Sequence, residues 1–338
     1  MQDEPQTGRN MMILAGDIGG TNTRLGIFTA TRGPNHPLVT RKYPSRAYDG
    51  LEEVVRHFMG TYDVVVQRAS FGVAGPIKDN RSAITNLSWV IDGDALGRTT
   101  AIGDVALLND LEAMAYAIPN LDAAMLETIN PGVPVTECVK ALIAPGTGLG
   151  EVFLTWCGGR YRSHGSEGGH TEFGPRNALE MALLDYLLQF HEHVSYERVC
   201  SGMGLPNLYA FLRDTGRCPE PPGFARRLAR AADPTPVIVN AALDDPKNHS
   251  ICVAALKLFT AILGAEAGNL AMTVSAYSGV YIGGGIPPRI ADYIRSERFL
   301  AAFQNKGRLR RMIAGIPIYL VTHPDTALMG AACHALGL

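Results

Sequence analysis

Residues 11–28 read MMILAGDIGGTNTRLGIF, two apolar runs on either side of a glycine-rich turn. The runs 11–15 and 23–28 predict two strands of one hairpin, with the turn at 16–22. Glycines in such a turn let backbone N–H groups converge on phosphate oxygens with no Cβ in the way. The turn lacks the GxxxxGK[ST] pattern, so a P-loop is excluded. The stretch therefore predicts a hairpin that holds a nucleotide phosphate, with Asp17 as a ligand of Mg²⁺, directly or through water.

The same arrangement recurs later in the chain. The apolar run 139–144 precedes a second glycine turn, PGTGLG at residues 145–150, and Ile282 precedes the triplet Gly283-Gly284-Gly285. One such turn is equally consistent with an ordinary hairpin, but its repetition favours phosphate binding. The triplet is either a simple loop or a place where the backbone approaches adenosine or its phosphates. Two similar hairpins predict two related halves facing each other across a cleft.

Asn109-Asp110 follows the apolar run 105–108. A carboxylate at the end of a strand, beside an amide, can orient a substrate hydroxyl and accept its proton. Taken alone, the pair is more typical of a cap on the following helix, which begins at Leu111. Together with three glycine turns, it indicates transfer of a phosphoryl group from a nucleotide, with Asp110 as the base.

A further polar segment, SHGSEGGHTEFG, occupies residues 163–174. Here Glu167 and His170 are able to reach one ligand across a Gly-Gly link. A metal site is one interpretation, but no third ligand lies at a zinc-like spacing and the flexible link suits a rigid site poorly. A polyhydroxylated ligand fits better, because a carboxylate accepts and an imidazole donates hydrogen bonds to neighbouring hydroxyls. Glu197 by itself is more typical of a surface ion pair.

Composition excludes several classes of function. The chain has 338 residues, 46% of them hydrophobic, so a large core and two lobes are expected. A net charge of -2 and no long basic run argue against nucleic acid as a partner. Six scattered cysteines without CxxC spacing are expected to be reduced thiols. The polar N-terminus lacks an apolar signal core and no other segment looks long enough to span a bilayer, so we expect a cytoplasmic protein with no membrane partner.

Periodicity outlines the remaining architecture. The segments 51–58, 177–188 and 251–270 have helical spacing, and the segment 316–321 followed by 326–335 predicts a strand and a helix. Turn residues near 118–120 mark the start of a second lobe. We therefore expect a small α/β lobe over residues 1–118 and a larger α+β lobe over 119–316. The Pro- and Arg-rich stretch 217–236 is interpreted as a surface insertion with solvated basic residues.

Taken in order, these motifs resemble bacterial-type glucokinase, the ATP-dependent glucose kinase of the actin-like hexokinase superfamily. The resemblance covers nearly the whole chain. It is carried by the turn at residues 17–22, Asn109-Asp110, the turn 146–150, the EGGH segment 167–170, the YERVCSG segment 196–202 and the GGGI segment 283–286. A neighbouring zinc-containing repressor and kinase group shares two of these patterns, but its CxCGxxGC segment is absent here.

The resemblance implies an α/β, two-lobed actin-like fold of the ribonuclease H type, with residues 317–338 returning to the first lobe, and a homodimer. It implies transfer from ATP, with Mg²⁺, to the 6-hydroxyl of glucose, the first step of glycolysis. Asp110 is then the catalytic base. The implied glucose ligands are Asn109, Asp110, Glu167, His170 and Glu197, and the implied nucleotide ligands are Asp17, Gly19, Gly20, Thr21, Asn22, Gly146, Thr147, Gly148, Gly283, Gly284 and Gly285. Alternatives are a kinase for mannose or N-acetylmannosamine, or a sugar-responsive regulator without turnover, against which the presence of Asp110 counts.

Overall fold

A computed structural model describes residues 11–84 and 87–338. The chain forms two compact units. The first comprises Met1–Met125, Trp156–His164 and His323–Leu338, and the second comprises Leu126–Thr155 and Gly165–Thr322.

The first unit is built on a five-stranded sheet in the order β3-β2-β1-β4-β7. β1 pairs antiparallel with β2 through the glycine turn, and β4 and β7 continue the sheet in parallel with β1. The predicted hairpin is therefore confirmed. The strands of this unit are β1 Met12–Ile18, β2 Asn22–Thr29, β3 Val39–Pro44, β4 Arg68–Val73 and β7 Asp104–Asn109, with β5 Arg81–Ala83 and β6 Val90–Asp92 forming a separate ribbon.

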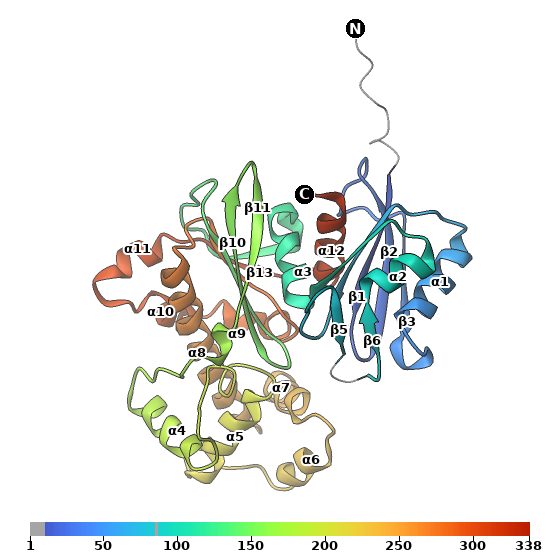
Figure 1. The fold of residues 1–338 in the computed structure, drawn as a ribbon. Coiled ribbons are helices and arrows are strands. Elements are labelled where there is room, and N and C mark those ends of the chain that lie inside the picture. Colours follow the sequence, from blue (N-terminus) through green and yellow to red (C-terminus); the bar gives the residue numbers. More distant parts are fainter. Residues whose placement is uncertain (1–10, 85–86) are drawn as a thin grey trace. The chain divides into compact units, whose positions relative to one another are not determined.

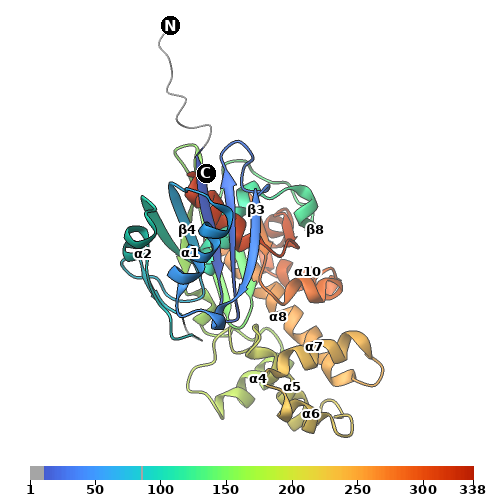
Figure 2. The same ribbon diagram turned by 90° about the vertical axis from the view of Figure 1, so that its right-hand side faces the viewer.

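Helices cover both faces of this sheet (Figures 1 and 2). Successive residues of a strand point to opposite faces. Ile13 and Ala15 accordingly pack with α12, whereas Leu14 packs with the core that includes α1. Burial on both faces explains why β1 is almost continuously apolar. The helices of this unit are α1 Leu51–Tyr62, α2 Gly93–Thr100, α3 Asp110–Ala117 and α12 Thr326–Leu336, with 3₁₀ turns at Ser45–Ala47, Ile118–Asn120 and Ala123–Met125.

The second sheet has six strands in the order β11-β10-β9-β12-β13-β8. Most of it belongs to the second unit, but Trp156–His164, which include the end of β10 and most of β11, are assigned to the first unit. The centre of this sheet repeats the plan of the first unit: β9 and β10 form an antiparallel hairpin across the second glycine turn, and β12 and β13 extend the sheet in parallel with β9. The strands are β8 Leu126–Asn130, β9 Lys140–Pro145, β10 Leu149–Cys157, β11 Arg160–Ser166, β12 Gly279–Ile282 and β13 Ile318–Val321.

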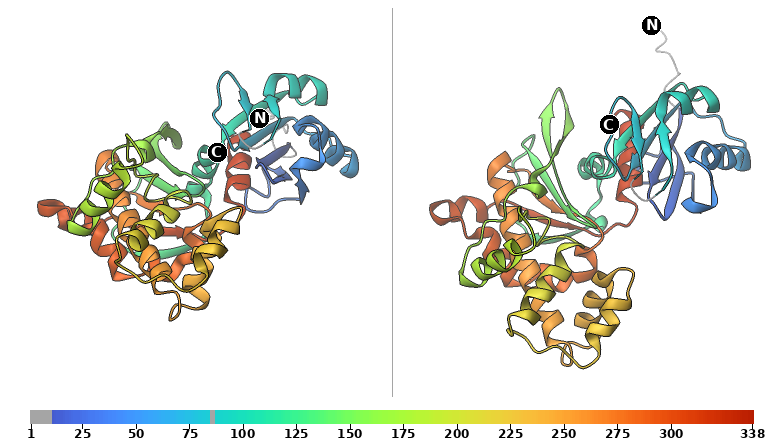
Figure 3. Two further views of the ribbon diagram at one scale, coloured as in Figure 1. Left: turned by 90° about the horizontal axis from the view of Figure 1, so that it is seen from below. Right: turned by 60° about the horizontal axis from the view of Figure 1, so that its bottom comes forward.

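Helices make up the rest of the second unit, and α4 to α7 gather beside one end of α8 (Figure 3). They are α4 Ala178–Leu188, α5 Gly204–Asp214, α6 Phe224–Arg230, α7 Pro234–Asp244, α8 Ser250–Val274, α9 Ala291–Ile294, α10 Glu297–Gln304 and α11 Arg310–Ala314, with 3₁₀ turns at Gly168–His170, Pro287–Ile290 and Gly307–Leu309. The stretch 217–236, interpreted from sequence as an insertion, contributes α6 and the start of α7.

α8 corrects one statement drawn from the sequence. Among the described residues it is long and apolar enough, by length and composition, to cross a membrane. However, 78% of its most apolar window is buried within the protein. Its apolar character therefore follows from its place in the core, where it packs against α5, α7 and α10.

The limits of the two units differ in detail from the lobes expected from sequence. β13 pairs with β12 and β8 in the sheet of the second unit, so the segment that rejoins the first unit begins at His323 rather than at residue 317. The backbone of the strand 318–321 is hydrogen-bonded within that sheet, so this strand belongs to the second unit.

Candidate active site

The first glycine turn is held in shape by Ser45, which sequence reasoning missed. The Gly19 N–H donates to the Asn22 carbonyl at 3.0 Å, which closes the turn. The Ser45 N–H donates to the Thr21 carbonyl at 3.0 Å, and its hydroxyl donates to the Gly19 carbonyl at 2.8 Å. Because these bonds take up carbonyl oxygens of the turn, the conformation around Gly20 is fixed before any ligand binds.

Asp17 lies near the end of β1, just before this turn. Burial raises the pKa of its carboxyl group to about 6, against the opposing effect of Arg24, and the charges of Asp110 and Asp325 raise it further. Arg24 is itself engaged in an ion pair with Asp325. The site therefore has more carboxylate charge than nearby cations, which suits a divalent ion held by one or two carboxylates and by substrate phosphates. Within the described residues, no cluster of three or more His, Cys, Asp and Glu side chains forms a metal site of its own.

Asn109 ends β7 and caps α3, so the capping alternative is correct for this residue. Its Oδ1 accepts a hydrogen bond from the Leu111 N–H at 3.0 Å, and its Nδ2 donates to the Gly75 carbonyl at 3.2 Å. An amide has two donor hydrogens and two acceptor lone pairs. The two donor hydrogens are taken by the Gly75 carbonyl and the Asp110 carboxyl group, so one acceptor lone pair remains for a ligand after the cap is formed.

Asp110 begins α3, and its Oδ1 also accepts from the Leu111 N–H, at 2.9 Å. The carboxyl group is open to solvent on one side. Desolvation by the surrounding protein nevertheless raises its pKa, and hydrogen bonds from Leu111, from its own N–H and from Asn109 partly oppose that shift. A raised pKa strengthens a carboxylate as a proton acceptor.

The strand register brings these two acids to the same edge of the sheet. Ile18 of β1 stands beside Val73 of β4, and Val73 stands beside Asn109 of β7. The strands β1, β4 and β7 are parallel, so their carboxyl ends meet at one edge, which is where open α/β sheets bind ligands. Asp17, the first glycine turn and Asp110 therefore share that edge within the first unit.

The second unit holds the other two glycine motifs next to each other. The Gly283 N–H donates to the Ile143 carbonyl at 2.9 Å, so the triplet follows β12 beside the end of β9. Gly284 has a positive φ of 87°, and a methyl group built there would lie 2.5 Å from the Pro145 carbonyl oxygen. The close backbone approach at this glycine is therefore to Pro145 at the start of the second turn. At Gly146 and Gly285, by contrast, no atom lies within 4 Å of such a methyl group.

Glu167, His170 and Glu197 are brought together by their backbones. The Glu197 N–H donates to the Gly169 carbonyl at 2.8 Å, and Gly169 packs so tightly on Leu149 that a methyl group would lie 2.1 Å from the Leu149 oxygen. The Glu197 carboxylate accepts from the Leu149 N–H at 2.9 Å rather than forming a surface ion pair. The Glu197 carboxylate and the backbone of the segment 167–170 thus lie at the start of β10, and Glu167 and His170 are exposed.

Two acidic side chains under this segment were missed by sequence reasoning. Glu151 of β10 and Glu266 of α8 are 3% and 5% exposed and contact each other. A charged residue inside the apolar runs LGEVFL and GAEAGN was the available signal, but nothing in the sequence pairs the two.

A surface pocket of about 970 Å³ lies elsewhere in the second unit, against α8 and α10. Arg176, Lys257 and Arg298 are among its lining residues, and none of the predicted site residues is.

Comparison with known proteins identifies the family of this chain. A family model described as Glucokinase matches residues 14–337. The glucokinase of Nostoc punctiforme is 38% identical over 341 residues, covering 97% of this chain and 99% of that protein.

Two solved structures extend the comparison to the fold. The glucokinase from an Antarctic psychrotroph has a TM-score of 0.84 at 31% identity, covering 97% of this chain and 99% of that one. A ROK family glucokinase from Streptomyces griseus, in complex with glucose and AMPPNP, has a TM-score of 0.63 at 19% identity, covering 97% and 100%. The predicted fold class, the two-lobed actin-like sugar-kinase fold, is confirmed.

Proposed function

We propose a mechanism from one premise: this chain belongs to the glucokinase family. It is an ATP-dependent glucose kinase, and its general role is the entry of glucose into glycolysis. The observation that carries the mechanism is the shared edge of β1, β4 and β7, which presents Asp110 beside the first glycine turn.

In this mechanism Asp110 accepts the proton of the glucose 6-hydroxyl as that oxygen attacks the γ-phosphorus of ATP. Asn109 uses its remaining acceptor lone pair to orient the sugar. The bond between the γ-phosphorus and the bridging oxygen breaks, and ADP leaves with that oxygen. Little covalent chemistry falls to the protein, so most of the acceleration comes from positioning and from stabilising charge.

The glycine turns supply backbone N–H groups to the phosphates. Gly19, Gly20, Thr21 and Asn22 would hold one side, and Gly146, Thr147 and Gly148 the other, while Gly283, Gly284 and Gly285 would lie along the adenosine. Asp17 would hold Mg²⁺, directly or through water, and the ion would supply positive charge to the phosphates. The surroundings of Asp17 support this assignment: burial mainly raises its pKa, and the charges of Asp110 and Asp325, which add to that rise, favour a bound cation.

Sugar recognition in the second unit rests on Glu167, His170 and Glu197. Their carboxylates accept hydrogen bonds from sugar hydroxyls, and the imidazole of His170 donates or accepts according to its tautomer. Supporting this assignment, the backbone bond between Glu197 and Gly169 holds Glu197 beside the segment that carries the other two residues.

A coupled assay of ADP release over a panel of sugars tests the proposed function. We expect glucose to give the highest kcat/KM, with mannose and N-acetylmannosamine well below it, and the product to be glucose 6-phosphate. A higher kcat/KM for either alternative hexose would contradict the assignment. ADP release without sugar phosphate would contradict the transfer step.

We also propose that the protein is a cytoplasmic homodimer. Family membership supports the dimer, and the free thiols of the six cysteines are consistent with a reducing compartment. Light scattering coupled to size exclusion should give twice the chain mass of 36.3 kDa.

A further inference from the structure

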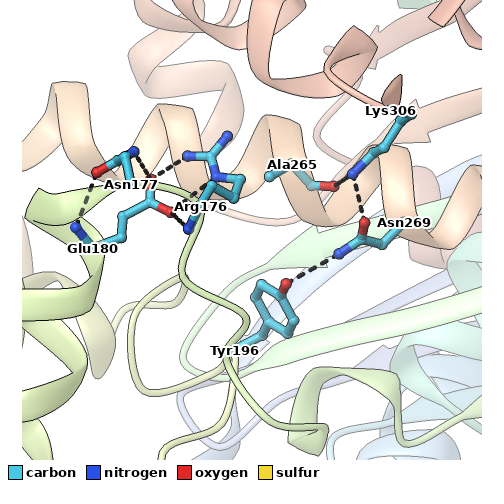
Figure 4. Close-up of polar contacts among 7 residues, drawn as sticks. All are labelled: Arg176, Asn177, Glu180, Tyr196, Ala265, Asn269 and Lys306. Carbon is cyan, nitrogen blue, oxygen red and sulfur yellow. Dashed lines mark hydrogen bonds and ion pairs between the residues drawn. The ribbon is translucent and has the colours of Figure 1, made fainter. Parts of the chain in front are cut away.

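A network of buried polar groups lies beneath the sugar-binding segment of the second unit. Figure 4 shows part of it: the Lys306 ammonium group donates to the Ala265 carbonyl at 2.9 Å and also bonds Asn269. Asn269 Nδ2 in turn donates to the Tyr196 hydroxyl at 3.0 Å. The same nitrogen also donates to Glu266 Oε2 at 2.9 Å. Tyr196 is adjacent in the chain to Glu197, so the network reaches a proposed sugar ligand through one peptide bond.

The other end of the network is the contact between Glu266 and Glu151. Two buried carboxyl groups in contact cannot both be ionised, because like charges repel strongly where water is excluded. Burial first, and then the Glu266 charge, raise the pKa of Glu151 to about 8. The pair therefore holds a proton at neutral pH.

The surroundings decide which carboxyl group keeps the proton. Glu266 is hydrogen-bonded by Asn269 and Tyr196 and lies near the Lys306 ammonium group, all of which favour its charged form. Glu151 Oε1 is buried with no other hydrogen-bond partner. A proton on Glu151 that is donated to Glu266 gives this buried carboxyl group a hydrogen bond.

Glu151 also touches the sugar-binding loop directly. A methyl group built on Gly168 would lie only 2.1 Å from Glu151 Oε2, so the carboxyl group packs against the backbone between Glu167 and His170. The Glu151–Glu266 pair thus contacts the segment that carries Glu167 and His170 through Gly168. It is hydrogen-bonded through Tyr196 to the segment that carries Glu197.

We propose that Glu151 and Glu266 form a proton-sharing pair that positions the sugar-binding segments, so that glucose affinity depends on the proton they share. This rests on the proposed sugar role of Glu167, His170 and Glu197. When Glu151 loses its proton, two adjacent negative charges repel, and the glycine-linked loop beside Glu151 is the part most able to shift. Sugar binding then favours the protonated pair, and glucose affinity falls as the pH rises above about 8.

Other titratable groups face the pair, and their effect on glucose binding must be distinguished from that of the shared proton. Burial raises the pKa values of the Tyr196 hydroxyl and the Cys200 thiol, so both stay neutral over this range. Burial lowers the pKa of Lys306, with Arg176 adding to the effect. Loss of the Lys306 charge at high pH would also change glucose affinity. A Glu151 variant distinguishes this effect from loss of the proton shared by Glu151 and Glu266.

Calorimetric titration of the full chain with glucose, without nucleotide, is the test. Between pH 7 and 9.5 we expect the wild-type Kd to rise about three- to tenfold, corresponding to a pKa difference of about half to one unit between bound and free protein. Near pH 8.5, two buffers of different ionisation enthalpy should reveal uptake of a fraction of a proton on binding. Glu151→Gln stays neutral and retains a donor, so its Kd should not vary with pH and no proton should be taken up.

Two further variants keep the result interpretable. Glu266→Gln removes the neighbouring charge, so loss of the Glu151 proton no longer places two negative charges together and the rise in Kd should disappear; this test holds even if Glu151→Gln fails to fold. Glu180→Gln neutralises another buried glutamate, which pairs with Arg176 (Figure 4), and should keep the wild-type pH dependence.

A wild-type Kd that is flat across this range, or a Glu151→Gln variant with the wild-type pH dependence, would overturn the proposal. Absence of glucose binding at pH 7 would instead contradict the proposed function itself.

Discussion

Asp110 and Glu112 both lie in the first turn of α3 but have different roles. Glu112 accepts a hydrogen bond from the Asn109 backbone N–H, while Asn109 caps the helix with its side chain, a reciprocal arrangement that stabilises the helix start. Asp110 is not needed for that cap. Its carboxylate is therefore available to a substrate, and the two acids form a matched pair for testing.

Asp110→Asn should lower kcat by about 10² or more, because an amide cannot accept the hydroxyl proton in the chemical step. Fold should be retained, since asparagine can accept the same hydrogen bond from the Leu111 N–H. Glu112→Gln is the control: it removes one charge from the same turn and keeps the acceptor for Asn109, so kcat should remain near wild type. Steady-state kinetics with circular dichroism of each variant provides the measurement. An Asp110→Asn enzyme with nearly normal turnover would remove Asp110 from the base role.

At the scale of elements, α3 depends on its contact with α12. A methyl group built on Gly330 of α12 would lie 1.6 Å from the Ala113 carbonyl oxygen of α3. The helices therefore touch backbone to backbone at this point. Because Asp110 begins α3, this packing sets the position of the proposed base relative to the sheet.

Gly330→Ala should force the two helices apart and destabilise the protein by about 1–3 kcal/mol, the usual cost of overpacking. It should also reduce kcat, because α3 carries Asp110. Gly60→Ala is the matched control: Gly60 lies in α1 with no atom within 4 Å of an added methyl group, so the same substitution should stabilise the helix by up to about 1 kcal/mol. Denaturant unfolding of both variants gives the free energies. Equal effects of the two substitutions would show that the contact with α3 is not limiting.

Elements with strong local signals were predictable from sequence. The hairpin at 11–28 and the helices at 178–188 and 250–274 appear because strand and helix periodicities and glycine turns are local properties of the chain. Which sheet the strand 318–321 joins depends on partners far away in the sequence, and the sequence interpretation placed that strand with the first lobe rather than with the second. The Glu151–Glu266 contact was likewise beyond reach, because it depends on how α8 packs against β10.

At the scale of the whole molecule, the residues proposed to bind glucose are divided between the two units. Asn109 and Asp110 belong to the first, and Glu167, His170 and Glu197 to the second. A ligand shifts a conformational equilibrium only by its difference in affinity for the two states. If one sugar takes hydrogen bonds from both units, its full set is made only in the arrangement where both reach it.

Glucose should therefore draw the units together, exclude water from the phosphate and reduce wasteful hydrolysis of ATP. Solution scattering should show a smaller radius of gyration with saturating glucose than without it. A His170→Ala variant, saturated with glucose as judged by calorimetry, lacks one partner in the second unit and should show a smaller change. If the wild-type radius is unchanged while the sugar is bound, then either the units already stand in their closed arrangement or the sugar ligands come from one unit alone. His170→Ala and Asp110→Asn together separate these outcomes. Glucose affinity should fall in both variants if the units are already closed, and in only one of them if the ligands come from one unit alone.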